Sequence, residues 1–532
     1  MNITAAIPAR AGSVGIPNKN TRIVAGHPLI VYAIENALNS KYINKVIVIS
    51  DSEEIEMIAE SYDVVFKKED DNLRAGSITL DEVVCSALED EDLDYSVTLQ
   101  PTSPTLKVET LDAAIEFAIE NDYDTVLSAV NRPKLGWIIK NGKLVPDYEK
   151  RLNRQYLPKH YMETGSFVIC KQYVLDRKTR FGDSVSVYEV SDEEAFDIDG
   201  FNDLICAENI LTKKNIAIMV NGNNSIGMGH IYRMLDLADM FYTKPVFFYD
   251  ENLTERSAFG NTTYELQSFS NRRELLNMLD WGNYDIVIND ILDTDKDYIT
   301  EIKSISSEPK VVNFEDNGSG RYAADLVVNA LYSGDNPEYA IYSGEEYYIV
   351  PKSFTFFNEI QIKNNVNSVF ICFGGADPRN YTEMVMDLIG QDEFRHLSFH
   401  VVIGRAKKNV NELLCRASEN LHIYYDIKCM PKIMSQCDVA ITSRGRTCFE
   451  LAYLGIPTLS IAQNDKEMMH SFVIEENGFL SLDNHADYEE VKRNVSTLIN
   501  LSYQKRLDMQ SKLKRKDLSK GRNRVRDLIL DL

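Results

Sequence analysis

The sequence predicts an α/β protein with mostly parallel sheets, in which a Rossmann-like domain is followed by two further Rossmann-like lobes. Apolar runs such as KVIVIS, YSVTLQ and DTVLSAV alternate with helical patterns such as LDAAIEFAIEN, which is typical of βαβ units. At Asn215 the chain restarts with an apolar run and a glycine-rich turn like those at its beginning. A length of 532 residues exceeds what one hydrophobic core usually serves, so several domains are expected.

Two groups of apolar runs follow the restart. The first contains PVFFYD, DIVIND, KVVNFED and DLVVN, and the second contains SVFICFGG, SFHVVIG, LHIYYD, DVAITS and TLSIA. A polar interval, KSFTFFNEIQIKNNVN, separates them. We therefore predict three parts, residues 1–212, 213–345 and 366–532. The last two parts are predicted to form lobes with a cleft between them, where ligands meet the carboxyl ends of both sheets.

Composition limits the kinds of ligand. The chain has 57 Lys and Arg against 81 Asp and Glu, a net charge of −24, which repels nucleic acid and anionic membranes over most of the surface. We therefore expect no nucleic-acid partner, and small phosphate ligands in locally basic pockets. No stretch reaches the length of a membrane span and the N-terminus lacks the layout of a signal peptide, so we expect a cytoplasmic protein. The eight cysteines form no C-x-x-C pair, which argues against a zinc site.

The stretch IPARAGSVGIPNKN follows the first apolar run and is typical of a phosphate-binding loop. Gly12 and Gly15 let backbone N–H groups approach phosphate, while Arg10 and Lys19 supply positive charge and Asn20 lies beside them. The pattern is not a Walker loop because no GK[ST] follows, and it lacks the leading glycine pair of the dinucleotide fingerprint. It predicts a nucleoside triphosphate held near the first turn.

Further features of the first domain fit a nucleotide-transfer site. Thr79 stands at a predicted loop-to-helix start, Gln100 follows a buried run, and Arg154 lies in RQYLPKHY. In FDIDGFND, Asp197 and Asp199 are two apart, so in an extended segment both face one side and can jointly hold Mg²⁺. Each feature alone is also explained as a turn, a cap or a surface ion pair, and their ordered occurrence favours function.

Together these motifs resemble the cytidylyltransferases that activate nonulosonic acids, the CMP-sialate, CMP-legionaminate and CMP-pseudaminate synthetases, over about residues 1–212. The resemblance implies a glycosyltransferase A-like fold, CTP and a nonulosonic acid as substrates, and a CMP-sugar and pyrophosphate as products. It implies Mg²⁺ at Asp197 and Asp199, with Arg10 and Lys19 as catalytic cations. It also implies nucleotide or sugar contacts from Gly12, Ser13, Gly15, Asn20, Thr79, Gln100 and Arg154.

One position departs from the resembled family. Its R-x-x-S-K-G motif has Val14 in place of lysine here, so we expect reduced activity unless Lys19, Arg22 or Arg74 compensates for the missing cation. The resemblance further implies a homodimer through the N-terminal domain, in which the segment near residues 131–162 reaches the partner's site.

The restart at Asn215 carries its own motif. In VNGNNSIGMGHIYRMLDLADMF a glycine-rich turn runs into an amphipathic helix, with His230 in the first turn. The positive end of the helix dipole favours a pyrophosphate nearby and disfavours a protonated imidazole, so His230 is predicted to be neutral and able to act as a general base. A histidine at this position is also explained as a cap or packing residue.

Two further glycine turns precede predicted helices, and the earlier of them is predicted to face the first turn across the cleft. In CFGGADPRNYT, Gly374 and Gly375 suit phosphate, with Asp377 behind them. In SRGRTCFELAYLG a carboxylate one turn into the helix is placed to take both ribose hydroxyls, or else to complement the helix dipole. The residues of this second turn are Gly445, Arg446, Thr447 and Glu450.

These motifs resemble the UDP-sugar hydrolases of the pseudaminic acid pathway, which have the two-lobed glycosyltransferase B-like fold, over roughly residues 213–490. The resemblance implies that His230 activates water, that Asn464 positions substrate or water, and that the turn with Glu450 binds UDP. The implied reaction frees a 2,4-diacetamido-2,4,6-trideoxyhexose from UDP. Leu292 stands where the family has tyrosine, and Arg444 and Arg446 replace small residues of the family's turn.

Two alternatives stay open for the second part of the chain. A glycosyltransferase shares its scaffold, and a non-catalytic nucleotide-sugar sensor is compatible with Leu292. We rank hydrolysis first. Joined to the synthetase-like domain, it indicates a pseudaminic-type acid as the sugar that reacts with CTP.

Overall fold

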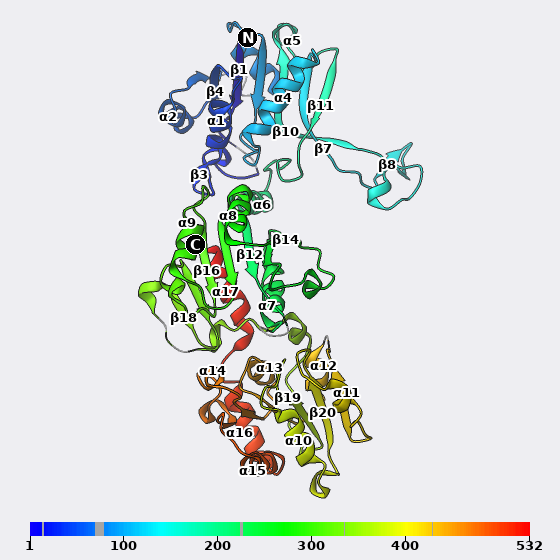
Figure 1. Cartoon of the computed structure of the whole chain (residues 1–532). Coiled ribbons are helices and arrows are strands. Elements are labelled where there is room, and N and C mark those ends of the chain that lie inside the picture. Colours follow the sequence, from blue (N-terminus) through cyan, green and yellow to red (C-terminus); the bar gives the residue numbers. More distant parts are fainter. Residues whose placement is uncertain (13–14, 70–78, 224–226, 333, 335, 428) are drawn as a thin grey trace. The chain divides into compact units, whose positions relative to one another are not determined.

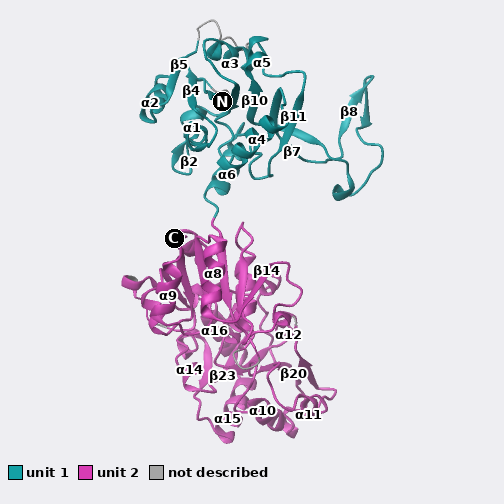
Figure 2. Cartoon of the chain, turned by 45° about the horizontal axis from the view of Figure 1, so that its top comes forward, with its two compact units in different colours: residues 1–213 teal, residues 214–532 magenta. Residues whose placement is uncertain are grey.

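The computed structural model describes residues 1–12, 15–69, 79–223, 227–332, 334, 336–427 and 429–532 (Figure 1). The predicted positions Ser13 and Val14 lie outside these residues. The chain divides into two compact units, Met1–Lys213 and Lys214–Leu532 (Figure 2).

The first unit is built on a sheet in which seven strands are described, in the order β11-β7-β10-β6-β1-β4-β5. β10 runs antiparallel to both of its neighbours, and the other pairs are parallel. The runs KVIVIS, YSVTLQ and DTVLSAV form β4, β6 and β7, as predicted. The strand bounds are β1 Ile3–Pro8, β4 Lys45–Ser50, β5 Val65–Lys68, β6 Tyr95–Leu99, β7 Thr125–Asn131, β10 Tyr161–Lys171 and β11 Val185–Glu189.

Helices cover both faces of this sheet. Alternate residues of β1 point to opposite faces, so Ala5 packs with Ile34 while Ala6 packs with Val84 in a separate cluster. The pattern is that of a strand buried on both sides. The helix bounds are α1 Leu29–Asn39, α2 Glu53–Ser61, α3 Leu80–Leu88, α4 Val108–Glu120, α5 Gln172–Asp176 and α6 Phe201–Leu211, and a small ladder joins β2 Ile23–Val24 to β3 His27–Pro28.

Residues 132–160, called the arm below, extend away from the body of the first unit (Figure 1). The arm contains an antiparallel hairpin of β8, Trp137–Lys140, and β9, Lys143–Pro146. Trp137 is 56% exposed and Ile139 is 77% exposed, so the hairpin leaves large apolar side chains in contact with water.

The second unit begins with a lobe whose described strands are all parallel and follow the order β14-β13-β12-β15-β16-β17-β18. Helices cover both faces of a parallel sheet, so its strands are near-continuous apolar runs in the sequence. The strand bounds are β12 Ile216–Val220, β13 Val246–Asp250, β14 Glu265–Phe269, β15 Ile286–Asp290, β16 Lys310–Phe314, β17 Leu326–Asn329 and β18 Ile341–Ser343. The helix bounds are α7 Gly229–Ala238, α8 Arg272–Gly282 and α9 Lys296–Lys303.

A second lobe follows, with described strands in the order β21-β20-β19-β22-β23-β24, again all parallel. The strand bounds are β19 Ser368–Cys372, β20 Ser398–Ile403, β21 Leu421–Tyr425, β22 Val439–Ser443, β23 Thr458–Ile461 and β24 Phe479–Leu482. The helix bounds are α10 Tyr381–Ile389, α11 Val410–Leu414, α12 Met430–Met434, α13 Thr447–Tyr453, α14 Asp465–Met468, α15 Tyr488–Ile499, α16 Tyr503–Leu513 and α17 Gly521–Leu530. The predicted fold class, one Rossmann-like sheet followed by two more, is confirmed.

The last helix returns to the first lobe. Val525 and Ile529 of α17 are fully buried and pack in one cluster with Ile218 of β12. Arg522 donates to the Asp236 carbonyl at 3.2 Å. The sequence assigned residues 366–532 to the second lobe, whereas α17 completes the core of the first, because its apolar face has its partners there.

Candidate active sites

The loop that follows β1 lies at the carboxyl edge of the first sheet. β1 pairs in parallel with β4 and β6, so the residues after all three strands gather at this edge. Arg10 is exposed, and its carbonyl accepts a 3.1 Å hydrogen bond from Asn20 Nδ2. Gly12 has φ +81°, a conformation that favours glycine. A hydrogen bond therefore joins two described residues, Arg10 and Asn20, near the two ends of the predicted phosphate loop.

The Asp-x-Asp segment, Asp197 to Asp199, contacts this loop. Ile198 is fully buried while Asp197 and Asp199 are exposed, so both carboxylates face the same side, as an extended segment requires. Lys19 Nζ donates to the Ile198 carbonyl at 2.8 Å and lies 3.6 Å from Asp199 Oδ1. A Cβ at Gly15 would lie 2.6 Å from the Asp199 carbonyl oxygen. Glycine at position 15 is therefore needed for the close approach of the two segments.

Gln100 reaches the same place from β6. A Cβ at Gly165, which has φ +73°, would lie 3.1 Å from Gln100 Nε2 and 3.7 Å from Asp197 Oδ2. Partial desolvation of the Asp197 carboxylate by the surrounding protein raises its pKa, the nearby charge of Asp199 adds to the rise, and a hydrogen bond from Thr102 and the charge of Lys19 oppose it. Gly165 was not predicted from the sequence, because the antiparallel strand that carries it was not recognised.

Two other predicted residues have different surroundings. Thr79 is the N-cap of α3, where its hydroxyl and Glu82 form a capping box, a role readable in the spacing T-x-x-E. Arg154 is exposed and lies on the arm. The structure groups Lys19, Gln100, Asp197 and Asp199, and it does not bring Thr79 or Arg154 of the same chain into that group.

In the second unit, His230 lies near the start of α7, and its Nδ1 is 2.6 Å from Asp290 Oδ1 at the end of β15. Asp290 is fully buried. Arg233, one turn along α7, donates two hydrogen bonds to the same carboxylate, from Nε to Oδ2 at 2.8 Å and from Nη2 to Oδ1 at 2.6 Å. Burial opposes ionisation of Asp290, but Arg233 and His230 outweigh it and hold its pKa below the usual range.

A second carboxylate continues this network. Glu315, directly after β16, accepts from Arg233 Nη1 at 2.5 Å and from Arg446 Nη2 of the second lobe at 2.7 Å. Burial would raise its pKa, but the two arginines lower it to about 2. The network thus runs without a break from His230 in one lobe to the predicted UDP turn in the other.

The remaining predicted residues of the second lobe lie after its strands. Burial raises the pKa of Glu450 on α13 to about 7, although the charge of Arg446 opposes the rise. Asn464 caps α14 by accepting from Glu467 N at 2.9 Å, a structural role for a residue predicted to position substrate or water. Gly445 and Thr447 flank Arg446 at the start of α13.

The Gly374–Gly375 turn packs closely against the backbone at Gly404. A Cβ at Gly404 would lie 2.4 Å from the Gly374 carbonyl oxygen, so the two turns are in close contact. Asp377 accepts from the backbone N–H groups of Tyr381 and Thr382 at the start of α10, and from the buried Lys407 Nζ at 3.0 Å. Lys407 was not predicted from the sequence, because nothing in its neighbourhood marks it as buried.

Leu292, at the position where the resemblance implies tyrosine, has φ +74°. A bulky residue is strained in this conformation, and such strain is found mainly at functional or tightly constrained positions. The loop that it belongs to follows Asp290 directly.

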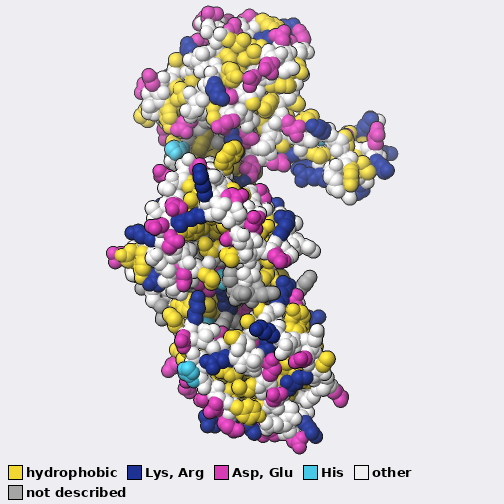
Figure 3. All heavy atoms as spheres, in the orientation of Figure 1, with side chains coloured by type: hydrophobic (Ala, Val, Ile, Leu, Met, Phe, Trp, Pro, Cys, Tyr) yellow, Lys and Arg dark blue, Asp and Glu magenta, His cyan; other side chains and the backbone are white. Residues whose placement is uncertain are grey.

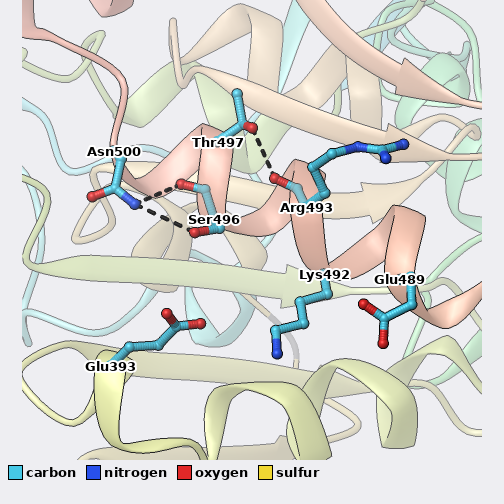
Figure 4. Close-up of a pocket in the computed structure, with 7 residues that line it drawn as sticks. All are labelled: Glu393, Glu489, Lys492, Arg493, Ser496, Thr497 and Asn500. Carbon is cyan, nitrogen blue, oxygen red and sulfur yellow. Dashed lines mark hydrogen bonds between the residues drawn. The ribbon is translucent and has the colours of Figure 1, made fainter.

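Other features of the described residues lie apart from these sites. An open depression of about 520 Å³ contains none of the predicted site residues (Figure 4). Its lining residues are Glu393, Glu489, Lys492, Arg493, Ser496, Thr497 and Asn500. In the described ranges, no three His, Cys, Asp or Glu are placed to hold a metal together, and no helix is long and apolar enough to cross a membrane.

Comparisons with known proteins agree with both predicted resemblances. Residues 4–197 match the model of a family described as cytidylyltransferase. The N-acylneuraminate cytidylyltransferase of Escherichia coli is 33% identical over 224 residues, which are 40% of this chain and 53% of that protein. The chain spans about half the length of this and the other first-ranked curated relatives.

A relative that matches over both units comes from Helicobacter pylori. It is named pseudaminic acid cytidylyltransferase and UDP-2,4-diacetamido-2,4,6-trideoxy-beta-L-altropyranose hydrolase, and it is 24% identical over 96% of this chain and 98% of its own length. Among solved structures, MurG of Acinetobacter baumannii is 14% identical over 60% of this chain and 100% of its own, with a TM-score of 0.45. The relatives from E. coli and H. pylori confirm the predicted similarity to CMP-nonulosonic acid synthetases and to the hydrolase fusion.

Proposed function

We propose that the chain carries two activities of nonulosonic acid biosynthesis. The first unit transfers CMP from CTP to a nonulosonic acid, and the second releases a 2,4-diacetamido-trideoxyhexose from UDP by hydrolysis. The observation that carries the second proposal is the His230–Asp290 pair, linked through Glu315 to the turn that holds Arg446. The two-activity relative from H. pylori, which matches both units, supports the combination and favours a pseudaminic-type acid.

In the first unit, Arg10 and Lys19 would neutralise the triphosphate while Gln100 contacts the nucleotide or the sugar. The anomeric hydroxyl of the acid attacks the α-phosphate and releases its proton to solvent, the bond from that phosphorus to the oxygen bridging to the β-phosphate breaks, and pyrophosphate leaves. Lys19, whose Nζ lies 3.6 Å from Asp199 Oδ1, connects the predicted phosphate loop to the acidic segment. From this position its ammonium group would contact both the triphosphate and Asp199.

Asp197 and Asp199 fit a divalent cation such as Mg²⁺. Their two carboxylates face one side with Lys19 as the neighbouring cation, and the charge of Asp199 helps to raise the pKa of Asp197, beside the larger effect of desolvation. Mg²⁺ is commonly held by one or two carboxylates together with substrate phosphates. When bound, the ion would offset the charge that develops on pyrophosphate.

The arm supports a homodimer through the first unit. Its exposed apolar hairpin is a surface that a partner would cover. It is also basic in an acidic chain, as Figure 3 shows, with eight cations against the two anions Asp147 and Glu149. The eight are Arg132, Lys134, Lys140, Lys143, Lys150, Arg151, Arg154 and Lys159. We propose that it carries Arg154 to the carboxylate of the sugar acid in the partner's site.

In the second unit, His230 acts as the general base. The ionised Asp290 only accepts hydrogen bonds, so Nδ1 of His230 carries the proton and Nε2 presents its lone pair. Nε2 takes a proton from water, which adds to the sugar as its bond to the diphosphate breaks. Arg446, the Gly374–Gly375 turn and Glu450 would hold UDP.

The test of the second activity uses the full chain with UDP-sugars and no acceptor, with free UDP as the readout. We expect release in the wild type and none in His230→Ala. Release that requires an added acceptor would overturn hydrolysis in favour of glycosyl transfer. For the first activity, CTP with a panel of nonulosonic acids is expected to yield pyrophosphate, fastest with the pseudaminic type.

A further inference from the structure

Glu315 is the residue that joins the two lobes of the second unit inside the candidate site. It is 8% exposed, and its two carboxylate oxygens are divided between the lobes. Oε1 accepts from Arg233 Nη1 of the first lobe at 2.5 Å, and Oε2 accepts from Arg446 Nη2 of the second at 2.7 Å. Among the described residues, Arg446 is the residue of the predicted UDP turn that pairs with a carboxylate of the His230 network.

The position of Arg446 is fixed from a second direction. A Cβ at Gly229 would lie 2.9 Å from Arg446 Nη1, so the guanidinium lies against the residue that precedes His230. The arginine therefore reaches out of its own lobe to the start of α7, where a glycine leaves room for it. Its side chain is 22% exposed, which leaves part of the fork open to a ligand.

The charges in this network are balanced without any ligand charge. Arg233 and Arg446 supply two positive charges, and Asp290 and Glu315 supply two negative ones. A diphosphate brought to the Gly445–Thr447 turn adds negative charge beside Glu315. The anion and Glu315 then compete for the Nη2 group of the same guanidinium, since each N–H of the fork donates to one acceptor at a time.

We propose that Glu315 is a positioning residue that competes with the diphosphate of UDP for Arg446 and thereby weakens UDP binding. When the diphosphate takes Arg446, Glu315 is left with Arg233 alone, and this changes the hydrogen bonds of Arg233 to Asp290, the carboxylate that contacts His230. Occupancy of the UDP site is in this way coupled to the general base, and release of the UDP product is favoured. The inference rests on the proposed hydrolase site.

The experiment measures UDP affinity by calorimetry at neutral pH on the full chain. Glu315→Gln keeps the shape and removes the charge, so the Kd for UDP is expected to fall about tenfold, the effect of removing one nearby charge of like sign. Glu345→Gln is the matched control, because Glu345 pairs with Lys516 at 2.8 Å in the same unit and outside the network. Its Kd is expected to equal that of the wild type.

A double-mutant cycle tests the route of the effect. In an Arg446→Gln background, Glu315→Gln is expected to change the Kd less than twofold, because the residue through which Glu315 acts is gone. Tightening that persists in this background, or weaker UDP binding in Glu315→Gln alone, overturns the proposal. If the wild type itself binds no UDP, the proposed hydrolase site is overturned and this inference with it.

Loss of a buried charge can also unfold the lobe, so a second variant keeps the charge. Glu315→Asp shortens the side chain by one methylene and cannot span both arginines. Its Kd for UDP is expected to fall by a smaller factor, about threefold, while the variant still unfolds in one cooperative thermal transition. An unchanged or higher Kd in a folded Glu315→Asp variant overturns the proposal by itself.

Discussion

His230 Nδ1 lies 2.6 Å from Asp290 Oδ1, and this contact sets which nitrogen of the imidazole is free to accept a proton. In Asp290→Asn the new amide donates as well as accepts, so the imidazole can turn its lone pair to position 290 and lose its basic Nε2. We expect UDP release to fall by about 10²- to 10⁴-fold. The measurement is the initial rate of UDP release at saturating UDP-sugar.

The control for this prediction is Asp239→Asn. Asp239 accepts from Tyr264 at 2.8 Å and from Lys352 at 2.9 Å, outside the His230 network. We expect it to retain hydrolysis within about twofold, since surface substitutions seldom change a distant site. Equal losses in both variants would show that Asp290 supports the lobe rather than the base.

Asp197 and Asp199 are expected to set the dependence of the first activity on metal. Asp199→Asn removes one of two candidate ligands, so pyrophosphate release should fall at least about tenfold at limiting Mg²⁺ and recover partly as Mg²⁺ is raised. Asp192→Asn, whose side chain is 65% exposed and pairs with Arg132, is the control. A Mg²⁺ dependence unchanged by Asp199→Asn would remove Asp199 from the metal site.

The sequence was sufficient for most strands of the sheets but not for the antiparallel β10, because only apolar runs buried on both faces are clear local signals. DIVIND and KVVNFED became β15 and β16 as predicted. The sequence also placed His230 and Arg446, through the glycine turns beside them. The spacing of three between His230 and Arg233 was readable as one helix face, although it was not used.

The hydrogen-bond partners of His230 and Arg233 could not be predicted from the sequence. Asp290 is 60 residues from His230, and Glu315 is 82 residues from Arg233. Their contact depends on the sheet order that puts β15 beside β12 and β16 beside β15. Long-range pairing of this kind has no local signal in a single chain, whereas the capping box of Thr79 did have one and was outweighed by the expected site.

Gly15→Ala is predicted to damage the first activity through the backbone. The added Cβ would come within 2.6 Å of the Asp199 carbonyl oxygen, so either the loop or the acidic segment must move. We expect pyrophosphate release to fall at least about tenfold, because displacement of a positioned group by about 1 Å can cost about a hundredfold. The same assay with CTP and the best sugar acid measures it.

A second glycine separates this effect from ordinary backbone strain. Gly26 has φ +90° with no atom within 4 Å of an added Cβ, so Gly26→Ala costs only conformational strain. We expect its free energy of unfolding to fall by about 1 kcal/mol with the rate retained. If Gly26→Ala lost as much activity as Gly15→Ala, contact with Asp199 would not be the cause.

Glu450 is predicted to make UDP binding depend on pH. Burial raises its pKa from 4.5 to about 7, so the folded protein binds a proton there more tightly than the unfolded chain does. Between these two values the stability contributed by the protonated group falls as pH rises, and it is lost above about pH 7. A ribose that donates both hydroxyls needs the ionised carboxylate, so UDP should bind more tightly at pH 8 than at pH 6.

Glu450→Gln tests both halves of this argument at once. The uncharged amide cannot titrate, so the fall in melting temperature between pH 5 and 8 should be smaller in Glu450→Gln than in the wild type. The part of the increase in UDP affinity from pH 6 to pH 8 that depends on ionised Glu450 should also be absent from the variant. The ionisation of UDP itself contributes equally to both proteins and cancels in the comparison. Parallel pH profiles for the two proteins would mean that Glu450 neither titrates in this range nor contacts the ribose.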